Sequence, residues 1–484
     1  MVTSGLKPER VFYYFEKISS IPRGSGNEKA VSDYCVSVAR ELGLYCYQDE
    51  VNNVLIRKPA SNGCEKAEGV IIQGHLDMVC EKNKDVIHDF INDPIKLIVD
   101  NNYLIADGTT LGGDDGIAIA MGLALIEDND IKHPQIELLF TTDEEVGMKG
   151  SKNFGSGLLS GTRLINLDSE DEGIFIVSCC GGAKAKVSVP VVTESAPVDF
   201  IPVAIRIRGL FGGHSGGDIH LQRANANKLM GRILRQLGKT FFFRLKSING
   251  GLMDNAITRE CDAIIYIPAE DIIELTDLCN QFENMFSNEY ASSEKSIKVF
   301  VERVEDKQEE VLDFETTNKI IYVLNLIPYG VMQISLEIEG LVETSNNLGI
   351  VRTLDSSVDF ICAVRSSVAT RKYDVLEGLQ MITELVGGTM TLKGEYPGWE
   401  YKKESKLREI CVQAYKEMFG NEPKVQAIHA GLECGLLGFK YPELDMISMG
   451  PEMHGIHTPC EKMSIPSVER MWSFITFVIE KLSE

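Results

Sequence analysis

The sequence predicts an α/β protein with a second, α+β domain inserted into it. Residues 1–188 alternate apolar runs with helical patterns, which is typical of an α/β layer fold. From about residue 189, alternating strands and a helix rich in small residues replace that pattern. Residues 396–484 then return to an α/β pattern. We therefore expect one α/β domain formed by residues 1–188 and 396–484, interrupted by residues 189–395.

The first domain contains three apolar runs that each end in a polar cluster. These runs are VIIQ before Gly74, IELLFTT before Asp143 and RLINL before Asp168. Ligands of open α/β sheets bind beyond the carboxyl ends of the strands, so we expect the three clusters to meet in one crevice. Helix-start residues at 25–28 (SGNE) predict an amphipathic helix that continues to about Leu42.

The inserted domain shows a partial internal repeat. Residues 205–210 (IRIRGL) resemble residues 336–341 (LEIEGL), and residues 262–268 (DAIIYIP) resemble residues 359–365 (DFICAVR). We expect each of these segments to be a strand, with a helix over RANANKLMGRILRQLG in the first copy. Chance similarity between amphipathic strands is the alternative interpretation. After the insertion we expect helices at 404–419 and 467–482 around an apolar run at 444–449.

Composition excludes several classes of partner. The 484 residues carry 48 Lys and Arg against 71 Asp and Glu, a formal net charge of −23. A polyanion repels phosphate backbones and anionic lipid surfaces, so we expect neither nucleic acid nor membrane as a partner. The N-terminal segment lacks a signal-peptide pattern, and no apolar run reaches the roughly 18 residues needed to span a bilayer. With twelve cysteines and no CxxC pair, these features predict a reduced, cytoplasmic protein.

The polar clusters offer imidazoles and carboxylates. His75 and Asp77 lie two residues apart at a predicted strand end and point the same way. Asp77 can therefore accept a hydrogen bond from the ring of a metal-bound His75 and fix its tautomer. Asp114 and Asp115 lie where a glycine-rich turn enters an apolar helix, and N-capping explains only one of them.

Three further clusters complete the set. TTDEEVG places three carboxylates in a row, which repel one another unless solvent or cations relieve them. INLDSEDEG places Asp168 at a strand end, and GPEMHGIHTPCEKM offers His454 and His457. Imidazoles and carboxylates without a thiolate pair suit zinc, cobalt or manganese. The residues alone therefore predict a two-metal hydrolase without naming the bond that it cleaves.

Seven ordered motifs resemble the family of cocatalytic zinc peptidases that includes glutamate carboxypeptidase, peptidase T and succinyl-diaminopimelate desuccinylase. The motifs are GHLDMVCEKN, DGTTLGGDDGIA, TTDEEVGMKGS, INLDSEDEG, FGGHSGGDIH, HAGLECG and HTPCEKM, and they span nearly the whole chain. One departure is Gly113, where the family pattern has alanine. The resemblance implies a mixed-sheet zinc-peptidase catalytic domain interrupted by a lid domain, and it is greatest to enzymes that cleave Xaa-His dipeptides.

The resemblance also implies a ligand set for two metal ions. His75, Asp114 and Asp168 correspond to the ligands of one ion. Asp114 would bridge to a second ion that Glu145 and His457 complete. Asp115 and His454 match no ligand position. The expected ions are zinc, with cobalt or manganese as alternatives.

The remaining functional residues follow from the same resemblance. Glu144 matches the general base and Asp77 the partner of His75, while His214 matches a lid histidine that stabilises the oxyanion. Further residues match substrate-pocket positions, namely Arg365 as a carboxylate-binding group, Asn255, and Glu433 as a clamp for a free amine.

The activity that the resemblance implies is that of a metal-dependent dipeptidase acting on small peptides. Xaa-His dipeptides such as β-alanyl-histidine are the expected substrates. A tripeptidase or an aminoacylase of the same family is the alternative within the class, and a non-catalytic peptide-binding protein is the alternative outside it. We expect a monomer or a homodimer.

The repeat leads to one hypothesis about the lid. In two-subunit relatives, one lid copy carries both the histidine and the arginine, and the histidine serves the partner's site. Here the first copy has His214 but Pro268 where the second has Arg365, and the second copy has Ser345 where the first has His214. We therefore expect the tandem lid to imitate a dimer, so that one chain can complete its own active site.

Overall fold

The computed structural model describes residues 1–305 and 310–484, which divide into two compact units. Unit 1 consists of Met1–Ser178, Tyr401–Ala427 and Leu432–Glu484, and unit 2 consists of Cys179–Glu400 and Ile428–Gly431. The first boundary falls at 179 rather than at the expected 189. The reason is that β9 (Gly181–Pro190) is a strand of the sheet of unit 2, where it pairs with β20 (Ser357–Ser366) and β21 (Thr389–Tyr396).

A mixed sheet forms the centre of unit 1, with strands in the order β1-β2-β6-β3-β7-β23-β8-β22. The strands are β1 (Tyr45–Gln48), β2 (Val54–Lys58), β3 (Val70–His75), β6 (Ile136–Thr141), β7 (Arg163–Asn166), β8 (Ile174–Cys179), β22 (Lys424–Ile428) and β23 (Asp445–Ser448). Strand β3 is parallel to both β6 and β7, which flank it. The three polar clusters therefore leave the sheet at one edge, as the sequence predicts.

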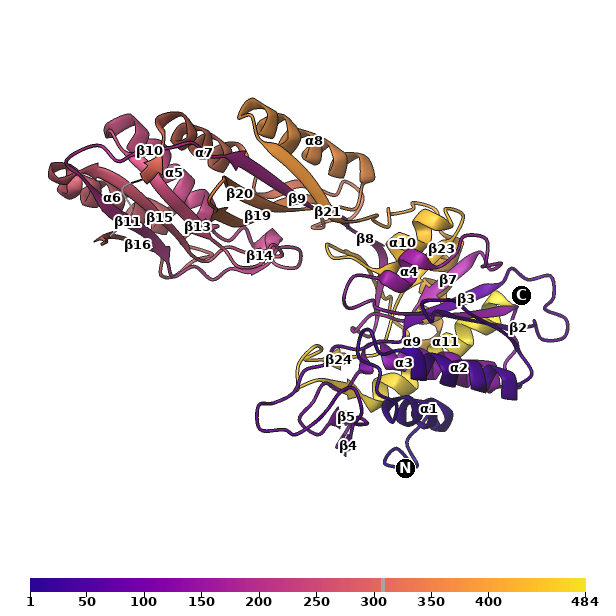
Figure 1. Cartoon of the computed structure of the whole chain (residues 1–484). Coiled ribbons are helices and arrows are strands. Elements are labelled where there is room, and N and C mark those ends of the chain that lie inside the picture. Colours follow the sequence, from indigo (N-terminus) through magenta and orange to yellow (C-terminus); the bar gives the residue numbers. More distant parts are fainter. Residues whose placement is uncertain (306–309) are drawn as a thin grey trace. The chain divides into compact units, whose positions relative to one another are not determined.

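Helices surround this sheet, and a small antiparallel sheet carries the last histidine cluster (Figure 1). The helices are α1 (Glu9–Ser19), α2 (Lys29–Glu41), α3 (Gly113–Glu127), α4 (Lys149–Asn153), α9 (Lys406–Phe419), α10 (Glu433–Lys440) and α11 (Ile465–Leu482). The small sheet contains β4 (Leu97–Asp100), β5 (Tyr103–Ala106), β24 (Met453–His454) and β25 (Lys462–Ser464). Helix α3 is buried on every side from Gly116 to Ile126, which explains its apolar sequence.

Close packing of α3 on β3 requires a glycine. A Cβ atom on Gly74 would lie 2.5 Å from the Cβ of Ala118 and 2.4 Å from a carboxylate oxygen of Asp115. Neither contact is tolerable, so the absence of a side chain at Gly74 lets the helix approach the strand that ends in His75.

Unit 2 contains a second sheet, with strands in the order β16-β11-β15-β13-β19-β20-β9-β21 and β18 paired to β19. Its further strands are β11 (Phe200–Arg208), β13 (Arg244–Gly250), β15 (Cys261–Pro268), β16 (Lys298–Arg303), β18 (Gly330–Ile334), β19 (Val342–Thr353), β20 (Ser357–Ser366) and β21 (Thr389–Tyr396). Shorter elements are β10 (Thr193–Ser195), β12 (Gly213–His214), β14 (Ala256–Ile257), β17 (Glu310–Leu312), η1 (Ile219–Leu221) and η2 (Ala269–Asp271).

Helices of unit 2 cover one face of this sheet (Figure 1). They are α5 (Ala226–Thr240), α6 (Ile272–Glu289), α7 (Phe314–Leu326) and α8 (Ala369–Leu385). One apolar cluster joins them to the strands, including Leu229 of α5, Leu275 of α6, Ile320 of α7 and Leu376 of α8. Burial of this shared face is what holds the α+β unit together.

The internal repeat holds for one of its two segment pairs. Residues 262–268 and 359–365 are both strands, in β15 and β20. Residues 336–341 are not a strand, which corrects the sequence prediction. Strand β18 ends before them, and the backbone N–H groups of Glu337 and Ile338 donate to the hydroxyl of Ser335, which turns the chain.

The two halves of the repeat nevertheless share one continuous sheet. Strand β13 of the first half pairs antiparallel with β19 of the second, through Asn249 opposite Arg352 and Gly250 opposite Val351. Among the described residues, no helix combines the length and the apolar character that crossing a membrane requires.

Candidate active site

The edge where β3, β6 and β7 end gathers the predicted metal ligands of unit 1. The Nε2 atom of His75 lies 3.0 Å from Oδ1 of Asp114 and 3.5 Å from Oδ1 of Asp168. The imidazole is buried, with 1% of its side chain exposed. One ligand atom from each of these three residues lies within 4.8 Å of the other two. The group therefore has the spacing of a metal site.

A second group shares Asp114 with the first. The Nε2 atom of His457 lies 2.9 Å from Oε1 of Glu145 and 3.3 Å from Oδ2 of Asp114. Asp114 thus turns one carboxylate oxygen toward His75 and the other toward His457. A carboxylate shared in this way is the arrangement that bridges two cations.

Glu144 lies beside these groups. One of its oxygens, a nitrogen of His75 and an oxygen of Glu145 lie within 4.8 Å of one another. Burial raises the pKa of Glu144 well above its ordinary value, and the nearby carboxylates of Asp168 and Glu433 act in the same direction. A carboxyl group with a raised pKa is suited to accept a proton near neutral pH.

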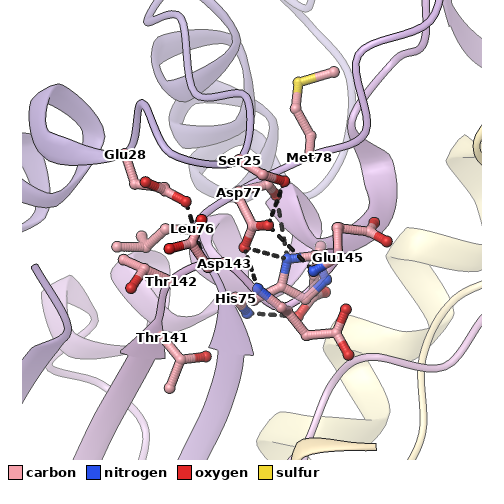
Figure 2. A network of polar contacts seen from close by, with 12 residues as sticks. Ser25, Glu28, His75, Leu76, Asp77, Met78, Thr141, Thr142, Asp143 and Glu145 are labelled. Carbon is pink, nitrogen blue, oxygen red and sulfur yellow. Dashed lines mark hydrogen bonds and ion pairs between the residues drawn. The ribbon is translucent and has the colours of Figure 1, made fainter. Parts of the chain in front are cut away.

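Asp77 organises the loop that carries both glutamates. Its carboxylate accepts hydrogen bonds from the backbone N–H groups of Glu144, at 3.0 Å, and Glu145, at 3.3 Å, and from the hydroxyl of Ser25, at 2.8 Å. Its Oδ1 also lies 3.4 Å from Nδ1 of His75 (Figure 2). Burial opposes ionisation, but these contacts lower the pKa of Asp77 to about 2. Asp77 therefore fixes both the ring and the loop.

Two buried charged residues that sequence reasoning missed hold the turn before Asp114. The carboxylate of Glu461 accepts hydrogen bonds from three consecutive backbone N–H groups at residues 111–113, at 2.8 to 3.1 Å. The guanidinium of Arg23 donates to the carbonyl oxygens of Leu76, at 3.0 Å, and Asp77, at 2.8 Å, and also to that of Gly112. Arg23 has no pattern around it in the sequence, whereas Glu461 follows the His457 cluster closely.

Asp115 has a different environment from Asp114. It is fully buried, and its Oδ2 accepts a hydrogen bond from the backbone N–H of His75 at 3.2 Å. Burial and the neighbouring carboxylate of Asp168 raise its pKa well above the ordinary value. His454 lies apart from both groups, in an ion pair with Glu452 at 2.9 Å.

The electrostatics of unit 1 fit divalent cations. Burial raises the pKa of Asp168 to about 8, and hydrogen bonds to Asp114 and Glu145 raise the pKa of His457 to about 10. For His75, burial acts against protonation, but the surrounding carboxylates raise its pKa well above the ordinary value. A site with so many carboxylates holds protons unless cations replace them. The imidazole and carboxylate donors match the ligand set of zinc, cobalt or manganese.

Glu433 does not have the environment expected for a clamp that binds a free amine. Its side chain is fully buried in unit 1, at the N-terminus of α10. Its oxygens accept hydrogen bonds from Gln73 at 2.6 Å, from Thr141 at 2.5 Å and from the hydroxyl of Ser151. Each oxygen of Glu433 therefore accepts at least one hydrogen bond within unit 1, and the substrate contact that the sequence suggests stays a prediction.

The other predicted residues lie in unit 2. His214 follows a glycine-rich turn, and its Nδ1 accepts a hydrogen bond from the backbone N–H of Gly217 at 3.0 Å. This bond requires a proton on Nε2 in the neutral ring. Burial and the charge of Arg365 lower the pKa of His214, which favours that neutral form. The carbonyl of Asn255 accepts from the backbone N–H of Ser215 at 2.8 Å and so joins the same turn.

Arg365 lies in unit 2 and forms no ion pair with any carboxylate of the residues that the structure describes. Its Nη1 donates to the hydroxyl of Tyr396 at 3.2 Å. Within residues 1–305 and 310–484, no carboxylate forms an ion pair with it, and the nearby Asp254 already pairs with Lys184 at 2.7 Å. His429, a residue to which sequence reasoning assigned no role, is kept neutral because burial and Arg365 lower its pKa to about 3.

Comparisons with known proteins show which family this chain resembles along its length. Residues 71–481 match the family model "Peptidase family M20/M25/M40". The chain is 38% identical to the cytosol non-specific dipeptidase of Escherichia coli (strain K12) over 479 residues, 99% of each protein. It is 39% identical to the solved structure of aminoacylhistidine dipeptidase from Vibrio alginolyticus, with a TM-score of 0.94 over 99% of this chain and 98% of the other.

A more distant structure shares the fold. Aminopeptidase PepT from Bacillus cereus is 13% identical, with a TM-score of 0.57 over 99% of this chain and 100% of the other. The family match covers most of the sequence, and the similarity to the Escherichia coli protein extends along almost all of it. This chain therefore belongs to the peptidase family M20/M25/M40.

Proposed function

We propose that this chain is a metal-dependent dipeptidase that uses two divalent ions and cleaves Xaa-His dipeptides among its substrates. The observation that carries the proposal is the shared carboxylate of Asp114, which faces His75 with one oxygen and His457 with the other. A shared carboxylate with an imidazole and a further carboxylate on each side is what a two-metal hydrolytic site needs. The names of the two similar dipeptidases support the substrate class.

Each ion would have three protein ligands. His75, Asp114 and Asp168 would hold one ion, and Asp114, Glu145 and His457 would hold the other. When bound, such ions polarise a carbonyl group and make water easier to deprotonate. Zinc is the metal that we propose, and cobalt and manganese accept the same donors.

Glu144 would act as the general base and then as the general acid. Its raised pKa fits a group that takes a proton from the attacking water and delivers it to the leaving amine. Asp77 supports this role, because its carboxylate accepts a hydrogen bond from the backbone N–H of Glu144 and also lies beside the ring of His75.

Unit 2 would contribute to transition-state and substrate binding. His214 presents a donor at Nε2, because Nδ1 is already occupied by the N–H of Gly217. A neutral donor of this kind stabilises an oxyanion as it develops. The guanidinium of Arg365, which pairs with no carboxylate among the described residues, suits the carboxylate of a dipeptide, and bidentate pairing would add geometric selectivity. Asn255 would contact the substrate from the same turn as His214.

A substrate panel tests the proposed activity. The metal-free protein, prepared with a chelator, should regain hydrolysis of β-alanyl-histidine and other dipeptides when zinc, cobalt or manganese is added. N-acetylated dipeptides and dipeptide amides should be poor substrates, because a dipeptidase reads both charged termini. Preference for a tripeptide would indicate a tripeptidase, and release of acetate from an N-acetyl amino acid would indicate an aminoacylase.

The same experiment tests the non-catalytic alternative. Tight peptide binding without chelator-sensitive turnover would indicate a peptide-binding protein and contradict the proposal. We further propose a small peptide as the physiological partner and the cytoplasm as the location, with support from the name of the Escherichia coli relative. Size-exclusion chromatography with light scattering distinguishes a monomer from a homodimer.

A further inference from the structure

Glu433 connects two neighbouring strands and a short helix of unit 1 from a fully buried position. Its Oε2 accepts from the side-chain amide of Gln73 on β3 at 2.6 Å and from the hydroxyl of Thr141 at the end of β6 at 2.5 Å. Its Oε1 accepts from the hydroxyl of Ser151 in α4. A residue from α10 thus fastens two strands and the short helix that follows the second of them.

Gln73 extends the connection to a third strand. Its side-chain oxygen accepts from the amide nitrogen of Asn166 on β7 at 2.6 Å, while its own amide nitrogen donates to Glu433. The side-chain amide of Gln73 therefore bonds to Asn166 and to Glu433 at the same time. In the sheet, Gln73 also pairs with Asn166 in register, and His75 pairs with Thr141. These side-chain hydrogen bonds therefore cross β6, β3 and β7 close to the carboxyl ends of the strands.

Each of the three strands joined by these hydrogen bonds leads directly to a proposed metal ligand. Gln73 lies two residues before His75, and Asn166 lies two residues before Asp168. Residues two apart on a strand share a face, so fixing Gln73 constrains the direction of His75 on β3. Asn166 is the last residue of β7, so fixing it holds the strand end from which Asp168 follows. Thr141 ends β6, from which the loop to Glu145 departs.

We propose that Glu433 is a positioning residue that holds the three ligand-bearing strand ends at the spacing required for metal binding. The proposal rests on the ligand assignment made under the proposed function. A buried carboxylate that accepts from several directions fixes its donors more narrowly than separate pairs would. Loss of one acceptor would leave buried donors unpaired and free to move, and the ligands beyond them would follow.

The chain contains a matched control in Glu137. The side chain of Glu137 is also fully buried. Glu137 lies on β6, the strand that contains Thr141, four residues before it. Its carboxylate accepts from Arg57 at 2.7 Å, from the backbone N–H of Ser160 at 2.9 Å and from that of Gly161 at 2.8 Å. None of these three donors precedes a proposed ligand. Glu433→Gln and Glu137→Gln therefore both remove a buried carboxylate that accepts hydrogen bonds from residues of unit 1, but only Glu433 is bonded to the strand ends that precede the proposed ligands.

The test compares metal affinity, kinetics and stability in the two variants. Zinc affinity of the metal-free proteins is measured by competition with a chromophoric chelator. We expect Glu433→Gln to weaken zinc binding about 10-fold or more and to lower kcat, with KM within about twofold of wild type. Glu137→Gln should lower the melting temperature of the metal-free protein while zinc affinity stays at the wild-type value.

A second variant keeps the test valid if Glu433→Gln folds poorly. The double variant Gln73→Glu with Glu433→Gln exchanges the amide and the carboxylate and restores an amide-to-carboxylate hydrogen bond between the two positions. We expect it to recover part of the zinc affinity lost in Glu433→Gln. The absence of any recovery would count against a role that acts through Gln73.

Other outcomes overturn the proposal distinctly. A raised KM with unchanged zinc affinity would return Glu433 to the substrate pocket, and equal losses of zinc affinity in both variants would reduce it to a general stability effect. Wild-type protein that binds no zinc would contradict the proposed function itself. Wild-type affinity and kcat in Glu433→Gln, with a normally metal-dependent wild type, would contradict only the positioning role.

Discussion

The polar cluster of unit 1 and that of unit 2 have opposite charge imbalances. In unit 1, five carboxylates surround two imidazoles, namely those of Asp77, Asp114, Glu144, Glu145 and Asp168. In unit 2, the guanidinium of Arg365 lies near two histidines that are held neutral, His214 and His429. The first cluster needs cations and the second needs an anion. A dipeptidase with bound metal and a substrate carboxylate would satisfy both needs.

The two clusters are also held in different ways. The ligands of unit 1 fix one another and are braced by buried charges such as Glu461, whose oxygens bind the backbone before Asp114. In unit 2, the ring of His214 is fixed by a single backbone N–H in a glycine-rich turn. Gly213 has φ +140°, and a Cβ there would meet Asp218 and Arg223 within 2.6 Å. In unit 1, contacts between side chains therefore fix the positions of the proposed metal ligands. In unit 2, the backbone conformation of the glycine-rich turn fixes the orientation of His214.

The largest loss of activity that we expect is that of a variant which distinguishes the general base, Glu144, from the neighbouring metal ligand, Glu145. Glu144→Gln should lower kcat about 10²- to 10⁴-fold, because the proton acceptor is lost. It should still bind two metal ions, because Glu145 and not Glu144 faces His457. Kinetics and metal analysis on one preparation check this. Loss of a whole metal equivalent would mean that the roles of the two glutamates are reversed.

A smaller effect, on KM, tests whether Arg365 of unit 2 binds the carboxylate of the substrate. Arg365→Met should raise KM for dipeptides about 10- to 100-fold, because a charge-assisted pair with the substrate carboxylate is removed. Metal content should not change, since Arg365 lies in the other unit from the proposed ligands. A dipeptide amide serves as the control substrate and should be nearly insensitive to the change. An equal loss with the amide would contradict a carboxylate-binding role.

The sequence alone predicts well which of the proposed ligands lie close together, and it predicts poorly the residues that support them. Gly74, Asp143 and Asp168 mark strand ends in the sequence, and parallel pairing of β3 with β6 and β7 brings those ends together. Strand ends are local signals, so they can be read without a structure. Arg23 and Glu461 act through backbone atoms that are distant in sequence, and no local pattern announces such contacts.

Glu433 and residues 336–341 show the same limit. The motif around Glu433 suggests a substrate contact, but only the fold reveals that its Oε2 accepts hydrogen bonds from Gln73 and Thr141. Residues 336–341 alternate as a strand would, yet Leu336 is 85% exposed and pairs with no strand of the described residues. An alternating pattern indicates a strand only where a sheet edge is present to receive it.

The charge imbalance of unit 1 predicts a pH effect on the metal-free protein. Hydrogen bonds to Asp114 and Glu145 raise the pKa of His457 to about 10, so stability from the paired imidazolium is complete below about pH 6.5 and is lost as the pH rises through 10. Asp168 acts in the same direction: burial raises its pKa to about 8, so its ionisation costs stability between about pH 4 and 8.

We therefore expect the melting temperature of the metal-free protein to fall by several degrees between pH 6.5 and 9.5. The metal-loaded protein should show a smaller fall, because its ligands are already deprotonated. Scanning calorimetry of both forms checks this. His457→Gln, in the metal-free form, should reduce the fall, and an unchanged fall would assign the effect to other groups.

The smallest expected effect is the absence of complementation between lid variants. His214 and Arg365 lie in the same unit of the same chain, and the charge of Arg365 lowers the pKa of His214. The halves of the tandem lid also join through β13 and β19 into one sheet. Mixing His214→Ala chains with Arg365→Ala chains should therefore give no more activity than the two variants show separately. Light scattering must first show that the variants associate if the wild type does. Substantial recovery would mean that a site borrows one of these residues from a second chain, and that the tandem lid does not replace a dimer.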